Sequence, residues 1–214
     1  MSPRRRRFLE LAGGIGVGSL VGCTASDDGD ESTPSSTPTP TPEPIEGNVA
    51  GTFAPEESGS GDAFGGAVAL TADGSPAIVG ADTSDDTNGF KAGSAYAFDG
   101  SGGTWSQQAK FGAEDGDPGD NFGAAVALGA RGELALVSAR WDEDPNGESA
   151  GSAYLFERSG GDWEQRTKLA ASDGNGGAVF GWSVGPSTGG GTGLVGAPGD
   201  DENGRQAGLT YVLD

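Results

Sequence analysis

Apolar residues occur along most of the chain in short alternating stretches, which clusters of glycine, aspartate and asparagine separate. Alternation with a period of two indicates β-strands that bury one face, and the intervening residues favour tight turns. The pattern is clearest in the middle of the chain, where four such stretches follow one another, at residues 122–128, 133–139, 151–157 and 163–170. The pattern therefore predicts an all-β fold of short strands.

These stretches belong to a unit that occurs three times. A Phe-Gly pair recurs with a constant spacing of 58 residues, and a Gly-Ser-Ala-Tyr stretch is shared by the first two units. Trp105 in the first unit recurs as Trp163 in the second. Such a period indicates that each unit is one supersecondary element that packs against its neighbours. The Phe-Gly pairs are Phe64-Gly65, Phe122-Gly123 and Phe180-Gly181.

The third unit contains three of the four expected strands. The units cover about residues 62–119, 120–177 and 178–214, whereas residues 50–57 precede the first unit and align with the fourth strand of the others. An unpaired sheet edge exposes backbone donors and acceptors. We therefore expect residues 50–57 to complete the third sheet, by pairing within one chain or between two.

The repeats resemble the FG-GAP repeats of integrin α-subunit propellers and their prokaryotic relatives. The Phe-Gly opening is present three times, and the Gly-Ala-Pro half is intact at Gly196-Ala197-Pro198. The resemblance implies a β-propeller-like array of about three four-stranded blades. Because known propellers close with four to eight blades, three arrangements are open: a six-bladed ring of two chains, an open or tight triangular array, and a degenerate fragment.

The N-terminal segment has the features of an export signal and a lipid anchor. Four arginines precede a short apolar stretch, and the pair Arg5 and Arg6 resembles the twin-arginine export motif. The stretch ends in Leu-Val-Gly-Cys, which resembles a lipobox and makes Cys23 the expected lipidation site. We interpret residues 1–22 as a signal peptide, residues 23–47 as a disordered stalk rich in threonine, proline and acidic residues, and residues 48–214 as the repeat domain.

Composition narrows the function further. The chain has 32 acidic and 12 basic residues and a formal net charge of −20, which repels nucleic acid. Such a surface suits high salt and favours a haloarchaeal source, with an ordinary acidic secreted protein as the alternative. The chain has one cysteine and no histidine. It therefore cannot form a Ser-His-Asp triad, a Cys-His pair or a histidine-ligated zinc site.

Three acidic loops between the second and third strands are the candidate metal sites. They combine carboxylates and amides with a glycine, as calcium-binding loops do, and calcium is the candidate cofactor. The alternative is that these loops are simply solvated. A second acidic segment, residues 114–120, is interpreted as a turn and not as a cation site. The candidate ligands are Asp82, Asp85, Asp86, Asn88, Asp142, Asp144, Asn146, Asp200, Asp201 and Asn203.

Taken together, these features favour a binding module over an enzyme. We expect an exported, lipid-anchored protein on the extracellular face of the cell membrane, with a surface protein or a glycan as its partner. The alternatives are an envelope protein that assembles with itself, for example as a homodimer that completes a ring, and a carboxylate-based hydrolase. Trp141 and Trp182 have no equivalents in the other units, and Trp141 is the candidate contact residue.

Overall fold

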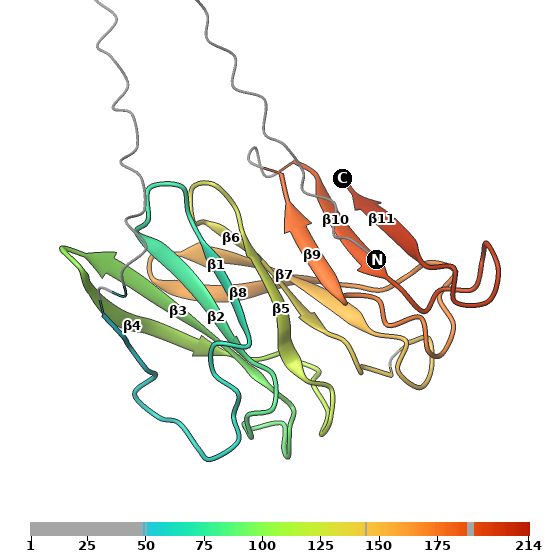
Figure 1. Cartoon of the computed structure of the whole chain (residues 1–214), viewed down its shortest axis with the longest axis horizontal. Helices are drawn as coiled ribbons and strands as arrows, with labels where there is room; N and C mark the ends of the chain where they lie inside the picture. The colour runs from blue at the N-terminus through green and yellow to red at the C-terminus, as the bar shows by residue number, and fades with distance from the viewer. Residues whose placement is uncertain (1–48, 50, 144, 188–190) are drawn as a thin grey trace, which may run out of the picture. The chain divides into compact units, whose positions relative to one another are not determined.

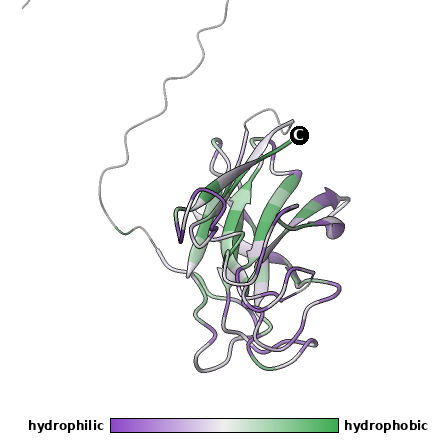
Figure 2. Ribbon diagram, turned by 90° about the vertical axis from the view of Figure 1, so that its right-hand side faces the viewer, coloured by the Kyte–Doolittle hydropathy of each residue, from purple (hydrophilic) through white to green (hydrophobic). Residues whose placement is uncertain are grey.

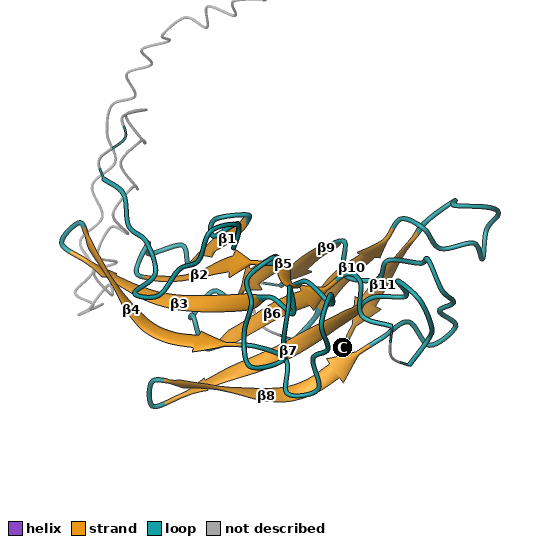
Figure 3. Cartoon of the chain, turned by 90° about the horizontal axis from the view of Figure 1, so that it is seen from below, coloured by secondary structure: helices purple, strands orange, loops and turns teal. Residues whose placement is uncertain are grey.

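The structure, a computed structural model, describes residue 49 and residues 51–143, 145–187 and 191–214. The chain divides into two units, Met1–Glu46 and Gly47–Asp214, and all described residues belong to the second. Within them there are only strands, turns and loops (Figure 3). The expected all-β class is confirmed.

Eleven strands form three antiparallel sheets among the described residues, and each sheet corresponds to one sequence unit. We call the sheets blades 1, 2 and 3. Their order is β1-β2-β3-β4, β5-β6-β7-β8 and β9-β10-β11 (Figure 1). Blade 1 contains β1 (Ala67–Leu70), β2 (Pro76–Ala81), β3 (Ser94–Ser101) and β4 (Thr104–Phe111). Blade 2 contains β5 (Phe122–Leu128), β6 (Leu134–Ala139), β7 (Ser152–Ser159) and β8 (Asp162–Leu169). Blade 3 contains β9 (Ser183–Pro186), β10 (Gly193–Ala197) and β11 (Leu209–Leu213).

The strand registers repeat from blade to blade. Val79 faces Tyr96, Val137 faces Tyr154, and Val195 faces Tyr211. The two outer strand pairs, β3 with β4 and β7 with β8, each contain a register shift at the same place, between Ala97 and Phe98 in blade 1. The sequence repeat is therefore a repeat of three-dimensional structure, as expected for a propeller-like array.

Two apolar clusters join the blades, with β5 packed against β1, β2 and β9. One cluster includes Ile78 of blade 1 with Phe122 and Val137 of blade 2, and the other includes Leu136 of blade 2 with Val195 of blade 3. Hydrophobic residues concentrate on the strands and hydrophilic residues on the loops (Figure 2). Burial between sheets thus contributes hydrophobic stabilisation, and a third cluster that includes Tyr96 and Phe98 lies within blade 1.

The second and third Phe-Gly pairs, which begin at Phe122 and Phe180, lie where the backbones of successive blades touch. The Phe122 N–H donates to the Ala92 carbonyl at 2.8 Å, and the Phe180 N–H donates to the Ala150 carbonyl at 2.8 Å. The next residue in blade 1 is Gly93, which has a φ of +88°, and a Cβ there would collide with the Phe122 backbone. Gly151 faces Phe180 in the same way. Glycine is required here because two main chains pass in contact.

The prediction that the N-terminal segment completes the third sheet within one chain is wrong. Residues 51–57 form no strand, and Phe53 packs on blade 1 instead of blade 3. Its ring lies 4.8 Å from that of Phe98 and stacks on Trp105 at 5.2 Å. Blade 3 keeps three strands in the described part of the chain, and β11 is its outer edge.

The alignment behind that expectation nevertheless holds. Phe111, the equivalent of Phe53, ends β4 and packs on the next blade, 4.8 Å from Phe156 and stacked on Trp163 at 5.7 Å. The N–H of the residue three positions later donates to a glutamine Oε1 at 3.0 Å in both cases, from Glu56 to Gln107 and from Glu114 to Gln165. Each such segment therefore inserts its aromatic residue into the blade that follows it in sequence.

This arrangement makes blade 1 dependent on Phe53. Phe53→Ala should lower the free energy of unfolding by about 2 kcal/mol, below the value for a fully buried phenylalanine because the ring is partly exposed. Urea unfolding measures this change, and hydrogen exchange should show loss of protection at Phe98 with no change at Tyr211. The exposed Val49→Ala is the control. Loss of protection confined to blade 3 would support the closing strand instead.

Candidate functional site

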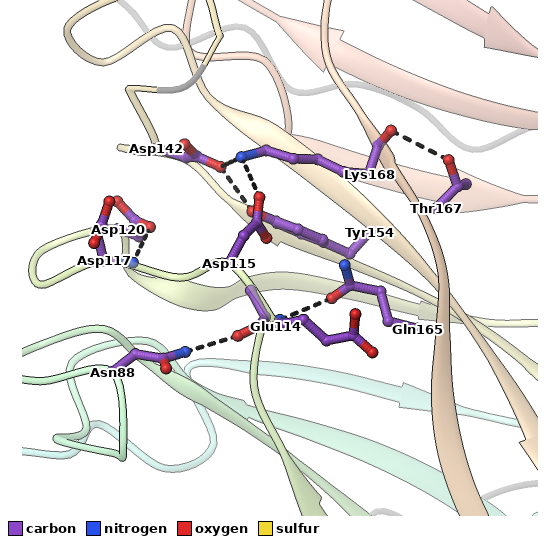
Figure 4. A network of polar contacts seen from close by, with 11 residues as sticks. Asn88, Glu114, Asp115, Asp117, Asp120, Asp142, Tyr154, Gln165, Thr167 and Lys168 are labelled. Atoms are coloured by element: carbon purple, nitrogen blue, oxygen red, sulfur yellow. Dashed lines mark hydrogen bonds and ion pairs between the residues drawn. The ribbon is translucent and has the colours of Figure 1, made fainter.

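The three acidic loops lie at the same end of the blades, next to the turns that lead from one blade to the next. They connect β2 to β3, β6 to β7 and β10 to β11, while residues 112–121 lead from β4 to β5. In Figure 4 the loop of blade 2 and the 112–121 turn meet at a network of polar contacts. This end of the molecule therefore collects most of the candidate residues that the sequence predicts.

Several of the predicted calcium ligands are hydrogen-bond acceptors within their own loops. Asp85 Oδ1 accepts the Lys91 N–H at 2.9 Å, and Asp86 Oδ1 accepts the Asn88 N–H at 2.7 Å. Asp201 accepts the N–H of Gln206 in blade 3. Lys91 and Gln206 both have positive φ, at 53° and 52°. In blades 1 and 3 the carboxylates thus hold the loop in a backbone conformation that residues other than glycine rarely adopt.

Two of the three predicted asparagine ligands tie their loops to the following turn. Asn88 Nδ2 donates to the Ala113 carbonyl at 2.7 Å (Figure 4), and Asn146 Nδ2 donates to the Ala171 carbonyl at 2.8 Å. Both contacts occupy equivalent places in blades 1 and 2. These two side chains therefore hold the loop of their blade to the backbone of the segment that leads to the next blade.

The structure gives no support to a calcium site in the part of the chain that it describes. No three carboxylate, cysteine or histidine side chains gather there in a way that could hold a metal ion, and Asp144 lies outside the described residues. Asn203 has no side-chain hydrogen bond among those recorded for its loop, in which Glu202 N–H donates to Asp200 Oδ1 at 2.9 Å. Calcium binding stays a prediction.

The polar network of blade 2 is centred on Lys168, which the sequence analysis did not single out. Lys168 Nζ lies 2.9 Å from Asp142 Oδ2 and 2.8 Å from Asp115 Oδ2 (Figure 4). Tyr154 donates to Asp142 at 2.7 Å, and its ring centre is 5.6 Å from the ammonium. Burial lowers the pKa of Lys168, but the bonds to Asp115 and Asp142 outweigh it and leave the pKa raised. The lysine therefore stays charged and holds the two loops together.

Blades 1 and 3 carry altered versions of this network. In blade 3, the Tyr211 hydroxyl lies within hydrogen-bond distance of Asp200, at 2.7 Å, and of Asp173, at 2.9 Å, and these are the equivalents of Asp142 and Asp115. In blade 1 the position of Asp142 is Ser84, which donates to Ser94 at 2.9 Å. Of the carboxylates predicted to bind calcium, Asp142 and Asp200 are thus buried acceptors for tyrosine.

Asp120, in the 112–121 turn, is the buried carboxylate with the most perturbed acidity. It accepts the Asp117 N–H at 2.7 Å, which confirms the turn interpretation (Figure 4). Burial, followed by the charges of Asp142 and Asp117, raises its pKa from 3.8 to about 6. The ionised form of Asp120 is thus disfavoured in the folded protein.

A second cluster brings together one residue or more from each of the three blades. Asp82 follows β2, and Arg140 follows β6 at the equivalent position; their Oδ2 and Nη2 atoms are 2.6 Å apart. The Arg140 guanidinium lies 5.7 Å from the ring of Trp141 and 5.7 Å from the ring of Trp182, which precedes β9. The two tryptophans are 38% and 54% exposed. We call Asp82, Arg140, Trp141 and Trp182 the tryptophan cluster.

The tryptophan cluster has the composition of an interaction site. Exposed tryptophans beside an arginine are typical of the residues that dominate binding energies, and a guanidinium between two rings is held by cation–π attraction. Arg140 Nε is buried and has no hydrogen-bond partner among the described residues. Sequence analysis named Asp82, Trp141 and Trp182 but missed Arg140. The opposite charges of Asp82 and Arg140 at equivalent repeat positions were the signal available.

Cys23, Arg5 and Arg6 lie outside the described residues, so lipidation and export stay predictions. Within the described part, no helix is long and apolar enough to cross a membrane.

Comparison with known proteins identifies the repeat. A family profile described as "FG-GAP repeat" matches residues 50–98, 105–156 and 163–213. No curated protein sequence matches the chain. Among solved structures, a chain described as "Kuenenia stuttgartiensis Hydrazine Synthase" is similar with 18% identity and a TM-score of 0.44. The match covers 69% of this chain and 33% of that one, so this chain spans about a third of its length.

The raised pKa of Asp120 predicts a pH dependence of stability. The folded protein binds the proton more tightly than the unfolded chain, so the contribution of Asp120 is fully present below about pH 4 and is lost as the pH rises through about 6. Asp120→Asn removes this titration. The stability of the natural protein relative to the variant should fall between pH 4 and pH 6 in urea unfolding. A difference that stays constant from pH 4 to pH 8 would contradict the assignment.

Proposed function

Because the chain belongs to the FG-GAP repeat family, we propose that it is an interaction module that binds a surface protein or a glycan through the tryptophan cluster. This proposal is based on one observation: residues from all three blades lie together, and they include two exposed tryptophan rings and one arginine guanidinium. A surface shared by all the blades requires the whole fold, whereas each blade alone would supply only a fragment of it.

The chemistry of the cluster suits either class of partner. Indole rings offer large rigid apolar faces at a low entropic cost, and such faces stack on sugar rings as well as on protein side chains. The guanidinium adds donors for a carboxylate or hydroxyl group of the ligand. Asp82, of which the side chain is 14% exposed, fixes the arginine in place before a partner arrives.

Binding is favoured over catalysis because the carboxylates at this end are already engaged. Asp142 accepts from Tyr154 and pairs with Lys168, Asp115 pairs with the same lysine, and Asp120 caps a turn. A carboxylate-based hydrolase needs a pair of acidic groups that face a substrate.

We also propose that the module is displayed outside the cell on a lipid anchor. The arginine pair, the apolar stretch before Cys23 and the stalk at residues 23–47 support this placement. Two acyl chains anchor a protein stably. The net charge of −20 suits a haloarchaeal setting, in which salt screens the repulsion between carboxylates.

The tryptophan cluster can be tested directly. Trp182→Ala should weaken binding to any glycan or envelope protein that the natural protein binds by about 2 kcal/mol, roughly thirtyfold in Kd, because a tryptophan at the centre of an interface is a typical hot spot. Glycan arrays and biolayer interferometry with purified envelope proteins measure the change. Phe90→Ala, which removes another exposed aromatic ring, is the control. Equal binding by all three proteins would rule out this surface.

The lipid anchor has its own test. Cys23→Ser removes the thiol that accepts the diacylglyceryl group, so the variant should lose the lipid mass and leave the membrane fraction or remain as an unprocessed precursor. Mass spectrometry and detergent phase partitioning distinguish these states, with Ser26→Ala as the control. Normal processing and membrane retention of Cys23→Ser would contradict lipidation at this residue.

A further inference from the structure

The outer edge of blade 3 differs from the outer edges of blades 1 and 2. The exposed side chains of β4 and β8 are polar, among them Lys110 and Arg166. The exposed side chains of β11 are Thr210 and Val212, and Val212 is 67% exposed. Natural sheets protect an edge with charges. The β11 edge lacks this protection and is suited to pairing with another strand.

In blade 2, two carboxylates and a tyrosine receive the lysine of the outer strand, and we call this arrangement of acceptors the carboxylate seat. Blade 3 has the acceptors but no outer strand that supplies a lysine among the described residues. In blade 2, Lys168 of β8 lies opposite Tyr154 in the strand register and pairs with Asp115 and Asp142. Lys110 of β4 lies opposite Tyr96 in the same way, with 5.6 Å between ammonium and ring centre. An outer strand thus delivers a lysine to the tyrosine of its blade.

Blade 3 has the acceptors of this seat and no cation. Tyr211 is bonded to Asp200 and Asp173, and among the described residues no lysine or arginine lies within ion-pair distance of either carboxylate. Asp200 is 3% exposed. A buried carboxylate next to a second one gains when an ammonium joins them. The seat is therefore complementary to a lysine side chain.

The outer strands of blades 1 and 2 also each contribute a tryptophan, and blade 3 has an apolar pocket at the equivalent place. In blade 2, Trp163 packs into the core beside Phe111, Leu128 and Phe156. In blade 3 the equivalent residues line an apolar pocket of about 200 Å³. These residues are Leu169, Pro186 and Leu213. The pocket is thus the place that an outer-strand tryptophan fills in the other blades.

We propose that the β11 edge binds an extended polypeptide segment that carries an aromatic residue and, five positions later, a lysine. Trp105 and Lys110 of β4 have this spacing, as do Trp163 and Lys168 of β8. The segment pairs with β11 as a fourth strand, its aromatic ring enters the pocket and its ammonium reaches Asp173 and Asp200. This is β-strand addition, in which backbone bonds supply affinity and side-chain seats supply specificity.

This docking edge is distinct from the tryptophan cluster and does not depend on the function proposed for it. The occupant is a polypeptide because an unpaired strand edge offers backbone donors and acceptors, which a strand satisfies. The bound segment must carry a positively charged side chain at one position, because the carboxylate seat has two carboxylates and the chain has a net charge of −20.

A synthetic peptide of residues 162–170, the chain's own outer strand, is the probe. Labelled and titrated against the full chain in molar KCl, it should bind with one-to-one stoichiometry in fluorescence polarisation. Replacing its lysine by glutamine or its tryptophan by alanine should each weaken binding at least tenfold. In the protein, Asp173→Asn should weaken binding by a similar factor, and Asp115→Asn, the equivalent change in blade 2, should leave it unchanged.

Three results would overturn the proposal. The first is the absence of saturable binding up to millimolar peptide, and the second is binding that ignores both the peptide lysine and Asp173→Asn. The third is a dimer in analytical ultracentrifugation that excludes the peptide, since a second copy of the chain would then cover the edge. Trp182→Ala should leave peptide binding intact, so failure here and failure of the tryptophan cluster are distinguishable.

Discussion

The close passage of two main chains at each blade junction is the constraint on which the rest of the structure depends. The Phe122 and Phe180 N–H groups bond to carbonyls of the preceding blade, and Gly93 and Gly151 leave no space for a Cβ at the contact. Because the phenylalanine rings then point into the core between the sheets, one junction fixes both the spacing and the burial of its two blades. Repeating that junction produces the array.

The second structural principle is that the segment before each blade contributes one apolar residue to the core of that blade. Phe53, Phe111 and Leu169 occupy equivalent places in blades 1, 2 and 3. Because each blade contains a residue from the segment before it, the stability of one blade depends on its neighbour. Stability is therefore spread over nearest-neighbour interfaces, as in other repeat proteins. It also leaves the outer strands free to carry polar residues and the network around Lys168.

Small departures from the repeat create the surfaces that differ between blades. Position 140 is arginine where blade 1 has aspartate and blade 3 has Pro198, and this difference makes a cross-blade ion pair beside two tryptophans. In blade 3, Asp173 and Asp200 surround Tyr211 without the lysine that blade 2 supplies. In both cases a regular frame places one departure from the repeat at a defined point, and loops held by a rigid scaffold are where binding residues commonly lie.

The sequence by itself determined the strands and the repeat. The strands expected at 122–128, 133–139, 151–157 and 163–170 match β5 to β8 within one or two residues, because alternation and turn residues are local properties. Only the tertiary structure decided where each segment docks. The alignment of residues 50–57 with the outer strands was sound, yet Phe53 enters blade 1, since the sequence of a segment does not state which neighbour receives it. Arg140 and Lys168 were missed for the same reason: their partners are distant in sequence, and only packing brings opposite charges together.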